Sequence, residues 1–206
     1  MKDKPFFAVV YMFVVTAFFS AVLIGFARLT RDRVQANEKL AFEKEVVQVF
    51  PTIQATNNTA IHQIFTEQFQ RRMAADDRVF YVYLKNGEIA GYAVPVEGKG
   101  FWDTIKGIVG VAPDQKTITA LAFYEQKETP GLGARIADPV FCDQFIGRKI
   151  ASGDKPIAIR PVGESLKENQ VHAVTGATQT CVRLEKLVND GLAQWRRFIE
   201  QQEGDQ

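Results

Sequence analysis

A run of 22 residues without a charge, from Phe6 to Ala27, constrains the fold of this chain more than any other feature. A helix rises 1.5 Å per residue, so a helix of this length spans about 30 Å, the thickness of a bilayer's hydrocarbon core. A cleaved signal peptide would have a shorter apolar core and a small-residue cleavage site, which is not evident here. The sequence therefore predicts an uncleaved single-pass membrane anchor over residues 1–27.

The charges beside this run bear on its orientation. Basic residues flank it on both sides: Lys2 and Lys4 before it, and Arg28, Arg31, Arg33, Lys39 and Lys44 after it. The positive-inside rule, taken alone, would place the large C-terminal part in the cytoplasm. Long domains translocate largely regardless of charge, so the charges leave the orientation open.

The composition of the whole chain excludes several classes. The 206 residues are 46% hydrophobic, enough for one domain with a core, and 25 basic residues balance 24 acidic ones. This balance gives no reason to expect a nucleic-acid partner. Cys142 and Cys181 have no CxxC spacing and no neighbouring histidine, which excludes a disulfide scaffold and an ordinary zinc site. A single disulfide and two buried thiols both remain compatible with the sequence.

Helical patterns follow the anchor. Apolar residues recur at helical spacing from Val34 to Phe50, and Pro51 closes the segment. A polar stretch over 52–60 predicts a loop, and residues 61–73 predict a second short helix. We therefore expect residues 28–75 to form a helical linker region.

Strand patterns begin near residue 78. Two β-rich runs, 78–84 and 88–96, flank Asn86–Gly87, which is the strongest short-range signal for a hairpin. The runs 107–112 and 117–126 predict another strand pair, and 155–163 a further strand. A terminal helix is predicted from an apolar stripe: Ala177, Cys181, Leu184, Val188, Leu192, Trp195 and Ile199. These elements predict an α+β domain over residues 76–206, in which an antiparallel sheet packs with helices.

Three segments of this domain contain residues suited to binding a ligand. The first, "GKGFW" at 98–102, combines glycines with Phe101 and Trp102, whose faces could stack on a planar ligand. Taken alone, this segment fits better a hairpin corner with a tryptophan in the core.

The second segment is "ETPGLG" at 128–133. Pro130 fixes one backbone angle, while Gly131 and Gly133 can adopt positive φ, so a tight loop is expected. No Gly-Lys-Ser/Thr follows, which excludes a P-loop. A ligand-binding loop and an ordinary Pro-Gly turn fit this segment equally well.

The third segment, "VTGATQT" at 174–180, precedes the terminal helix. Thr175 fits the N-cap and Thr178 then falls at N3. A helix N-terminus also binds phosphate, and a threonine there could donate a hydrogen bond to a phosphate or be esterified to it. From these residues alone, capping is the simpler interpretation.

Together the three segments resemble the FMN-binding domain family, which occurs in flavin-carrying subunits of the sodium-pumping NADH:quinone reductase and of the Rnf electron transport complex. "TGAT" at 175–178 is similar to the family's S/T-G-A-T flavinylation motif, and "ETPGLG" to its second recurrent motif. "GKGFW" is similar to the glycine-aromatic segment of the reductase's member of the family. The anchor followed by a helix ending in "VFP" also fits the family.

The resemblance implies that FMN is joined through its phosphate to Thr178, by a phosphoester that a separate flavin transferase makes. The cofactor-binding residues that it implies come from all three segments: Gly100, Phe101, Trp102, Glu128, Thr129, Gly131, Leu132, Gly133, Thr175, Gly176, Ala177 and Thr178. His172 stands where the family usually has an acidic residue, which bears on how readily a transferase modifies this chain. No metal ligands and no catalytic acid or base are expected.

The function implied is that of an electron-carrying subunit rather than a complete enzyme. Its partners would be other membrane subunits of a redox-driven ion pump, the flavin transferase and membrane lipid. The resemblance places the C-terminal domain on the periplasmic side of the inner membrane, against the charge rule. The alternative is a membrane-anchored flavin-binding module with a sensory or structural role, and the sequence does not decide between the reductase and Rnf contexts.

Overall fold

The computed structural model of the chain describes residues 5–74, 77–153 and 155–204. Contacts divide the chain into two compact units, Met1–Leu40 and Ala41–Gln206. The predicted linker, residues 28–75, therefore contributes to both units, while its division from a domain over 76–206 stays a prediction.

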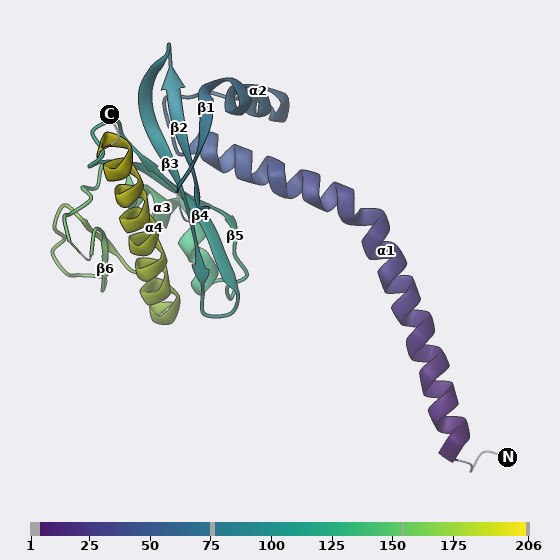
Figure 1. Ribbon diagram of the computed structural model, residues 1–206. Coiled ribbons are helices and arrows are strands. Elements are labelled where there is room, and N and C mark those ends of the chain that lie inside the picture. Colours follow the sequence, from purple (N-terminus) through teal and green to yellow (C-terminus); the bar gives the residue numbers. More distant parts are fainter. Residues whose placement is uncertain (1–4, 75–76, 154, 205–206) are drawn as a thin grey trace. The chain divides into compact units, whose positions relative to one another are not determined.

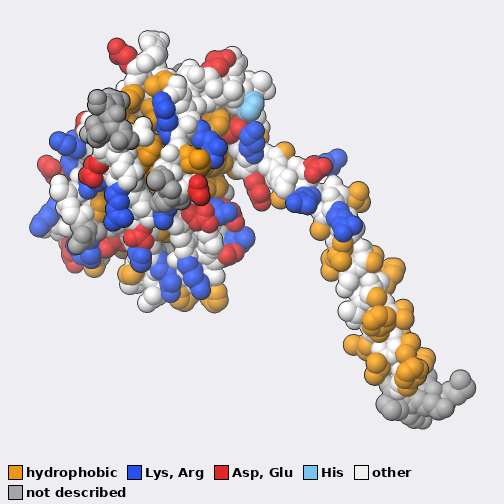
Figure 2. Space-filling model, viewed as in Figure 1, with side chains coloured by type: hydrophobic (Ala, Val, Ile, Leu, Met, Phe, Trp, Pro, Cys, Tyr) orange, Lys and Arg blue, Asp and Glu red, His pale blue; other side chains and the backbone are white. Residues whose placement is uncertain are grey.

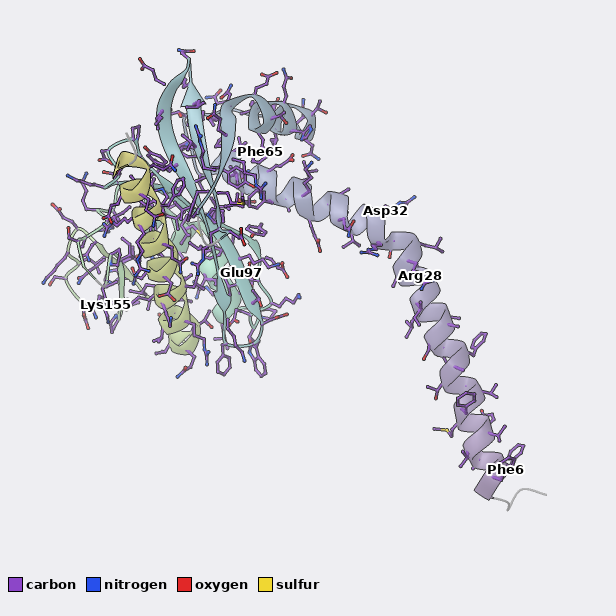
Figure 3. All side chains as sticks on the ribbon, viewed as in Figure 1. Phe6, Arg28, Asp32, Phe65, Glu97 and Lys155 are labelled. Atoms are coloured by element: carbon purple, nitrogen blue, oxygen red, sulfur yellow. The ribbon has the colours of Figure 1, made fainter. Side chains whose placement is uncertain are left out.

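The described residues of the first unit, 5–40, belong to one continuous helix, α1 (Pro5–Gln48). Phe6 and Arg28 mark the two ends of the apolar run in Figure 3, and Figure 2 shows hydrophobic side chains over its surface. These side chains are exposed, for example 77% for Phe6 and 68% for Phe26. Among the described residues, α1 is the one helix long and apolar enough to cross a membrane. The apolar run predicted as an anchor is helical, and the predicted helix after it continues it because no proline separates them. Residues 1–4 of the predicted anchor lie outside the described residues.

The second unit is built on a five-stranded antiparallel sheet of consecutive strands, drawn in Figure 1. The strands are β1 (Phe69–Met73), β2 (Val79–Lys85), β3 (Glu88–Lys99), β4 (Thr104–Val111) and β5 (Ile118–Glu125). Asn86 and Gly87 join β2 to β3 with φ of 55° and 84°, the two positive angles of a type I′ turn. The two predicted hairpins are confirmed.

Alternation along the strands covers both faces of the sheet. On one face the helix α4 (Thr178–Gly204) packs on strand residues such as Val94 and Val109. On the other face, Ala93 and Ile108 contact residues from the end of α1 and from α2 (Asn58–Gln68). Successive residues of one strand therefore point to opposite faces of the sheet and pack into two different hydrophobic clusters, as the two-residue repeat of a strand requires. The predicted fold class, a long apolar helix followed by an antiparallel sheet packed with helices, is confirmed.

The predicted helix over 61–73 is wrong in its second half. Helix α2 is capped by Asn57, whose Oδ1 accepts the N–H of Ala60 at 2.8 Å, but it ends at Gln68. Phe69–Met73 forms the edge strand β1 instead, with only Phe69 buried. Polar and charged residues on an edge strand look like an exposed helix face in the sequence, which explains the error.

The chain between β5 and α4 is mostly irregular. Short helices η1 (Gly133–Ala137), α3 (Pro139–Cys142) and η2 (Asp143–Phe145) follow the loop after β5. The predicted strand at 155–163 is reduced to β6 (Ala158–Arg160), which pairs in parallel with β7 (Gln170–His172).

Helix α4 fixes this irregular part through two polar side chains. Asn189 accepts the N–H of Ile157 and donates to its carbonyl, both at 2.8 Å. Glu185 accepts the N–H of Ile159 at 2.7 Å and lies 3.5 Å from the Nζ of Lys155, which Figure 3 labels. The predicted apolar stripe of α4 is confirmed, since all its residues are buried.

Candidate functional site

The start of α4 differs from the prediction. Residues Val174 to Ala177 form a turn in which Ala177 N–H donates to Val174 C=O at 3.1 Å, with Gly176 at φ 80°. The helix begins at Thr178, and its first helical bond joins Cys181 N–H to Ala177 C=O at 2.9 Å. Ala177 therefore occupies the cap position. The prediction of Thr175 at the N-cap and Thr178 at N3 is wrong, because the turn consumes the residues that were counted as the helix start.

This start leaves the helix end without a side-chain oxygen at its cap position. The amides of Thr178, Gln179 and Thr180 come before Cys181, whose N–H is the first helical donor, so they have no acceptor within the helix. Amides at a helix N-terminus carry partial positive charge and favour an anion. The first turn of α4 can therefore receive a negatively charged group.

Two threonines of this turn have opposite environments. Thr178 is exposed, whereas Thr180 is 4% exposed and donates its hydroxyl hydrogen to Glu128 Oε2 at 2.6 Å. Only the Thr178 hydroxyl is thus free of a buried partner and open to a reagent from solvent.

The loop after β5 folds into a tight turn. Leu132 N–H and Ala134 N–H both donate to the carbonyl of Thr129 at 3.1 Å. Gly131 has φ of 75°, the positive angle of a type II turn with proline before it. Gly176 lies beside this loop, since a Cβ on it would be 3.2 Å from Leu132 Cδ2. The "ETPGLG" and "TGAT" segments are therefore neighbours.

The "GKGFW" segment is the corner between β3 and β4. Gly100 N–H donates to Asp103 C=O at 2.8 Å and closes the corner. The expected hairpin corner is confirmed, but a core tryptophan is not: Trp102 is 65% exposed and Phe101 45%. Their rings meet edge to face with centroids 5.2 Å apart, so the corner presents an exposed aromatic pair.

Three contacts join this corner to the loop after β5. Trp102 donates its backbone N–H to Glu128 Oε1 at 3.0 Å and its indole N–H to Thr129 Oγ1 at 2.8 Å. Lys127 Nζ lies 3.0 Å from Asp103 Oδ2. This hydrogen bond holds the pKa of Asp103 below its ordinary value and raises the pKa of Lys127. Because both groups are exposed, solvent screens the pair, and the buried Glu128 contact is the stronger constraint.

A cleft of about 290 Å³ lies where the three segments meet. Eight of the predicted site residues line it: Phe101, Glu128, Thr129, Leu132, Gly133, Gly176, Ala177 and Thr178. The other four predicted residues are next to lining residues in the sequence but are not part of the lining: Gly100, Trp102, Gly131 and Thr175. The sequence reasoning overlooked Gln179 and Thr180, which also line it. They were overlooked because the predicted helix started at Thr175, which put both residues inside the helix instead of in its first turn.

A second cleft of about 390 Å³ also has Thr178 in its lining. Its lining is mostly apolar and includes Val162, Val174 and Val182 as well as Thr175 and Thr178. Thr178 therefore borders two hollows, one with an aromatic wall and one with an aliphatic wall.

The two cysteines do not act as nucleophiles at the site, although Cys181 lines the second cleft. Cys142 and Cys181 are both free thiols. Burial raises the pKa of Cys142 to about 12 and also raises the pKa of Cys181, so both stay protonated at neutral pH. Among the described residues, no group of three or more His, Cys, Asp or Glu could hold a metal ion.

His172 lies at the end of β7, three residues before Thr175. Its backbone N–H donates to Gln144 Oε1 at 2.8 Å, and its ring Nδ1 is 3.3 Å from Pro161 O. The side chain is partly exposed, so a partner protein can reach it.

Comparison with known proteins identifies this region. Residues 100–193 match the model of the FMN-binding domain. The NqrC subunit of the Na(+)-translocating NADH-quinone reductase from Neisseria meningitidis serogroup A is 37% identical over 120 residues, 57% of this chain and 45% of that protein. The NqrC subunit from Chlamydia caviae is 29% identical over 205 residues, covering 85% of this chain and 62% of that protein. The chain thus spans about half the length of the curated relatives that it matches.

Solved structures share the fold. The crystal structure of NqrC from Shewanella oneidensis aligns with a TM-score of 0.66 over 76% of this chain and 93% of that one, at 21% identity. The structure of the corresponding reductase subunit from Parabacteroides distasonis gives the same TM-score over 80% and 94%, at 23% identity. The residues that line the cleft, from Phe101 to Thr180, all lie inside the region that matches the FMN-binding domain model, residues 100–193.

Proposed function

We propose that this protein is a membrane-anchored flavoprotein subunit of the NqrC type that carries FMN on Thr178 through a phosphoester and relays electrons within an ion-translocating reductase. The observation that carries the proposal is the exposed hydroxyl of Thr178 at the first residue of α4, on a cleft with an aromatic wall. The neighbouring Thr180 is buried and engaged by Glu128, so it is a poor acceptor for the same bond.

The residues around Thr178 fit the phosphate end of FMN. A phosphodiester keeps one negative charge, and the amides of the first turn of α4, which have no acceptor within the helix, favour an anion by about 0.3–1 kcal/mol. Gly176, at φ 80°, adds no side chain beside the attachment point. Space and charge thus both suit a phosphoester at this residue.

The residues across the cleft fit the ring end. Phe101 and Leu132 are 45% and 47% exposed and offer apolar area that a planar ring system could cover. FMN, when bound, supplies the redox chemistry, accepting electrons singly or in pairs. The protein's own contribution is to hold the group at the surface of a rigid domain, where a redox partner can approach it.

The apolar run of α1 fits the role of anchor in the inner membrane. We propose an N-in, C-out topology, in which residues 28–206 lie on the periplasmic side with membrane lipid around Phe6–Ala27. Protease added to spheroplasts should then digest the C-terminal domain while a cytoplasmic control protein survives. A domain protected until the membrane is broken would contradict this topology.

The attachment is tested by intact-mass spectrometry of the full chain made with and without its native flavin transferase. We expect a gain of one FMN less one water only with the transferase, located on Thr178 by peptide sequencing. An unmodified chain in the presence of an active transferase would refute the covalent link.

The alternative function is a flavin-binding module with a sensory or structural role. Gentle solubilisation and purification of a tagged full chain separates the two functions. Co-purification of other flavin-carrying and iron–sulfur membrane subunits supports the relay, and a chain that purifies alone supports the alternative.

A further inference from the structure

We propose that Glu128 is the positioning residue of this site: its carboxyl group holds the β3–β4 corner, the 128–133 loop and the first turn of α4 in one arrangement. The inference deepens the proposed function and rests on it, because the arrangement matters only if Thr178 is the attachment point. Glu128 is 4% exposed, although it lies in a loop on the surface of the domain.

Both oxygens of Glu128 are used, and each serves a different segment. Oε1 accepts the backbone N–H of Trp102 at 3.0 Å, and Oε2 accepts the hydroxyl of Thr180 at 2.6 Å. These two residues are 26 positions before and 52 positions after Glu128 in the chain. One side chain therefore joins three segments that are remote in sequence.

Two glycines make room for this carboxyl group. A Cβ on Gly100 would lie 2.5 Å from Glu128 Oε1, and a Cβ on Gly133 would lie 2.9 Å from Oε2 and 2.6 Å from Thr180 Oγ1. Neither glycine has positive φ, so close approach rather than backbone conformation is what calls for glycine here. The glycines of "GKGFW" and "ETPGLG" thus fit around Glu128.

The consequence for the site follows from what is attached to each partner. Thr180 is two residues after Thr178 on the same helical turn, and Trp102 follows Phe101 at the corner. Holding Thr180 and Trp102 on one carboxyl group therefore brings Thr178 and Phe101 to the same cleft. Misplacing an attachment point by about 1 Å can lower a reaction rate by about a hundredfold.

Two variants of the full chain separate the effect of the length of the Glu128 side chain from the effect of its charge. Glu128→Gln keeps the length of the side chain: its oxygen can still accept from Trp102, and its amide can donate to Thr180 Oγ1. Glu128→Asp keeps the acid but is one methylene shorter, so it cannot span both partners. If Glu128 acts by position, flavin attachment ranks Glu, then Gln, then Asp, with Asp slower than Glu by at least about tenfold.

A second readout does not involve flavin. Hydrogen exchange of the Trp102 amide in flavin-free protein should be as slow in Glu128→Gln as in the unaltered chain, and faster in Glu128→Asp by about tenfold. Ile118→Val, a buried change at the far end of β5, controls for general loss of stability and should leave both readouts unchanged.

The outcomes distinguish this inference from the proposed function. An unaltered chain that the transferase does not modify refutes the proposed function, while the exchange result still tests the contact of Glu128. An unaltered chain that is modified, with Asp equal to or faster than Gln, overturns the positioning role and leaves the attachment standing. Equal exchange of the Trp102 amide in all variants overturns it as well.

Discussion

The exposed and buried sides of the first turn of α4 show how one short segment serves two purposes. Thr178, on the exposed side, borders two clefts, whereas Thr180 is enclosed and bonded to Glu128. Both residues are threonines on the same helix within two positions, so the difference comes from what packs against them. The buried threonine fixes the helix to the loops, and this fixed position makes the exposed threonine's location well defined.

Thr178→Ala should have the largest effect, which is on flavin attachment. It removes the hydroxyl of the first turn of α4 that is both exposed and in the lining of the cleft with the aromatic wall. We expect complete loss of flavin fluorescence from the protein band on a denaturing gel. Thr66→Ala, an exposed threonine of α2 outside both clefts, is the control and should keep the fluorescence. A fluorescent band in Thr178→Ala would move the attachment point elsewhere.

Gly133→Ala acts on the buried side. The added methyl would meet Thr180 Oγ1 and Glu128 Oε2 at 2.6 and 2.9 Å, so both must move. We expect a loss of about 3 kcal/mol in the free energy of unfolding, toward the upper end for overpacking. Gly147→Ala, where a methyl would meet no atom within 4 Å but φ is 76°, measures instead the cost of a positive φ, which Gly133 does not have. A loss of less than about 1 kcal/mol in Gly133→Ala would show that space at Gly133 is not what matters.

The sequence predicted much of this region, for reasons that the residues make clear. The hairpin at Asn86–Gly87 and the stripe of α4 follow from local turn geometry and periodicity, which the sequence encodes directly. The start of α4 was misplaced because the "VTGA" turn supplies the same residue types as a cap. The bond between Glu128 and Thr180 joins positions 52 apart, and no local pattern encodes it.

Thr180→Val is a gentler change on the buried side, since valine has nearly the shape of threonine. It removes the hydroxyl that donates to Glu128 Oε2 and leaves that oxygen with no hydrogen from the helix. The expected cost is about 2 kcal/mol of unfolding free energy, the usual penalty for a buried acceptor that loses its donor. Thermal or urea unfolding of the full chain measures it, and the double variant Thr180→Val/Glu128→Gln should cost less than the sum of the single changes. Additive losses would show that the two side chains are not coupled.

His172→Asp changes a residue close in sequence to the exposed Thr178, and it should change the rate of flavin attachment and not the free energy of unfolding. The family resemblance implies that a transferase meets an acidic residue here, where this chain has a partly exposed histidine. We expect faster flavin attachment in His172→Asp and unchanged attachment in His172→Gln. The time course of band fluorescence with limiting transferase gives both rates, and equal rates would mean that the enzyme does not read this position.

Thr175→Ala should have the smallest effect on stability, and it tests the corrected start of the helix. Had Thr175 been the N-cap, its loss would cost about 1 kcal/mol. In the structure Thr175 is exposed within the turn that Ala177 N–H closes on Val174 C=O, and the first helical bond is accepted by Ala177. The turn depends on positive φ at Gly176 and on backbone atoms, none of which the substitution removes. We therefore expect a change within about 0.5 kcal/mol, the range of ordinary surface substitutions. Urea unfolding of the flavin-free chain is the measurement, because bound flavin would add its own stabilisation. A loss near that of a true cap would place the helix start at Thr175 after all.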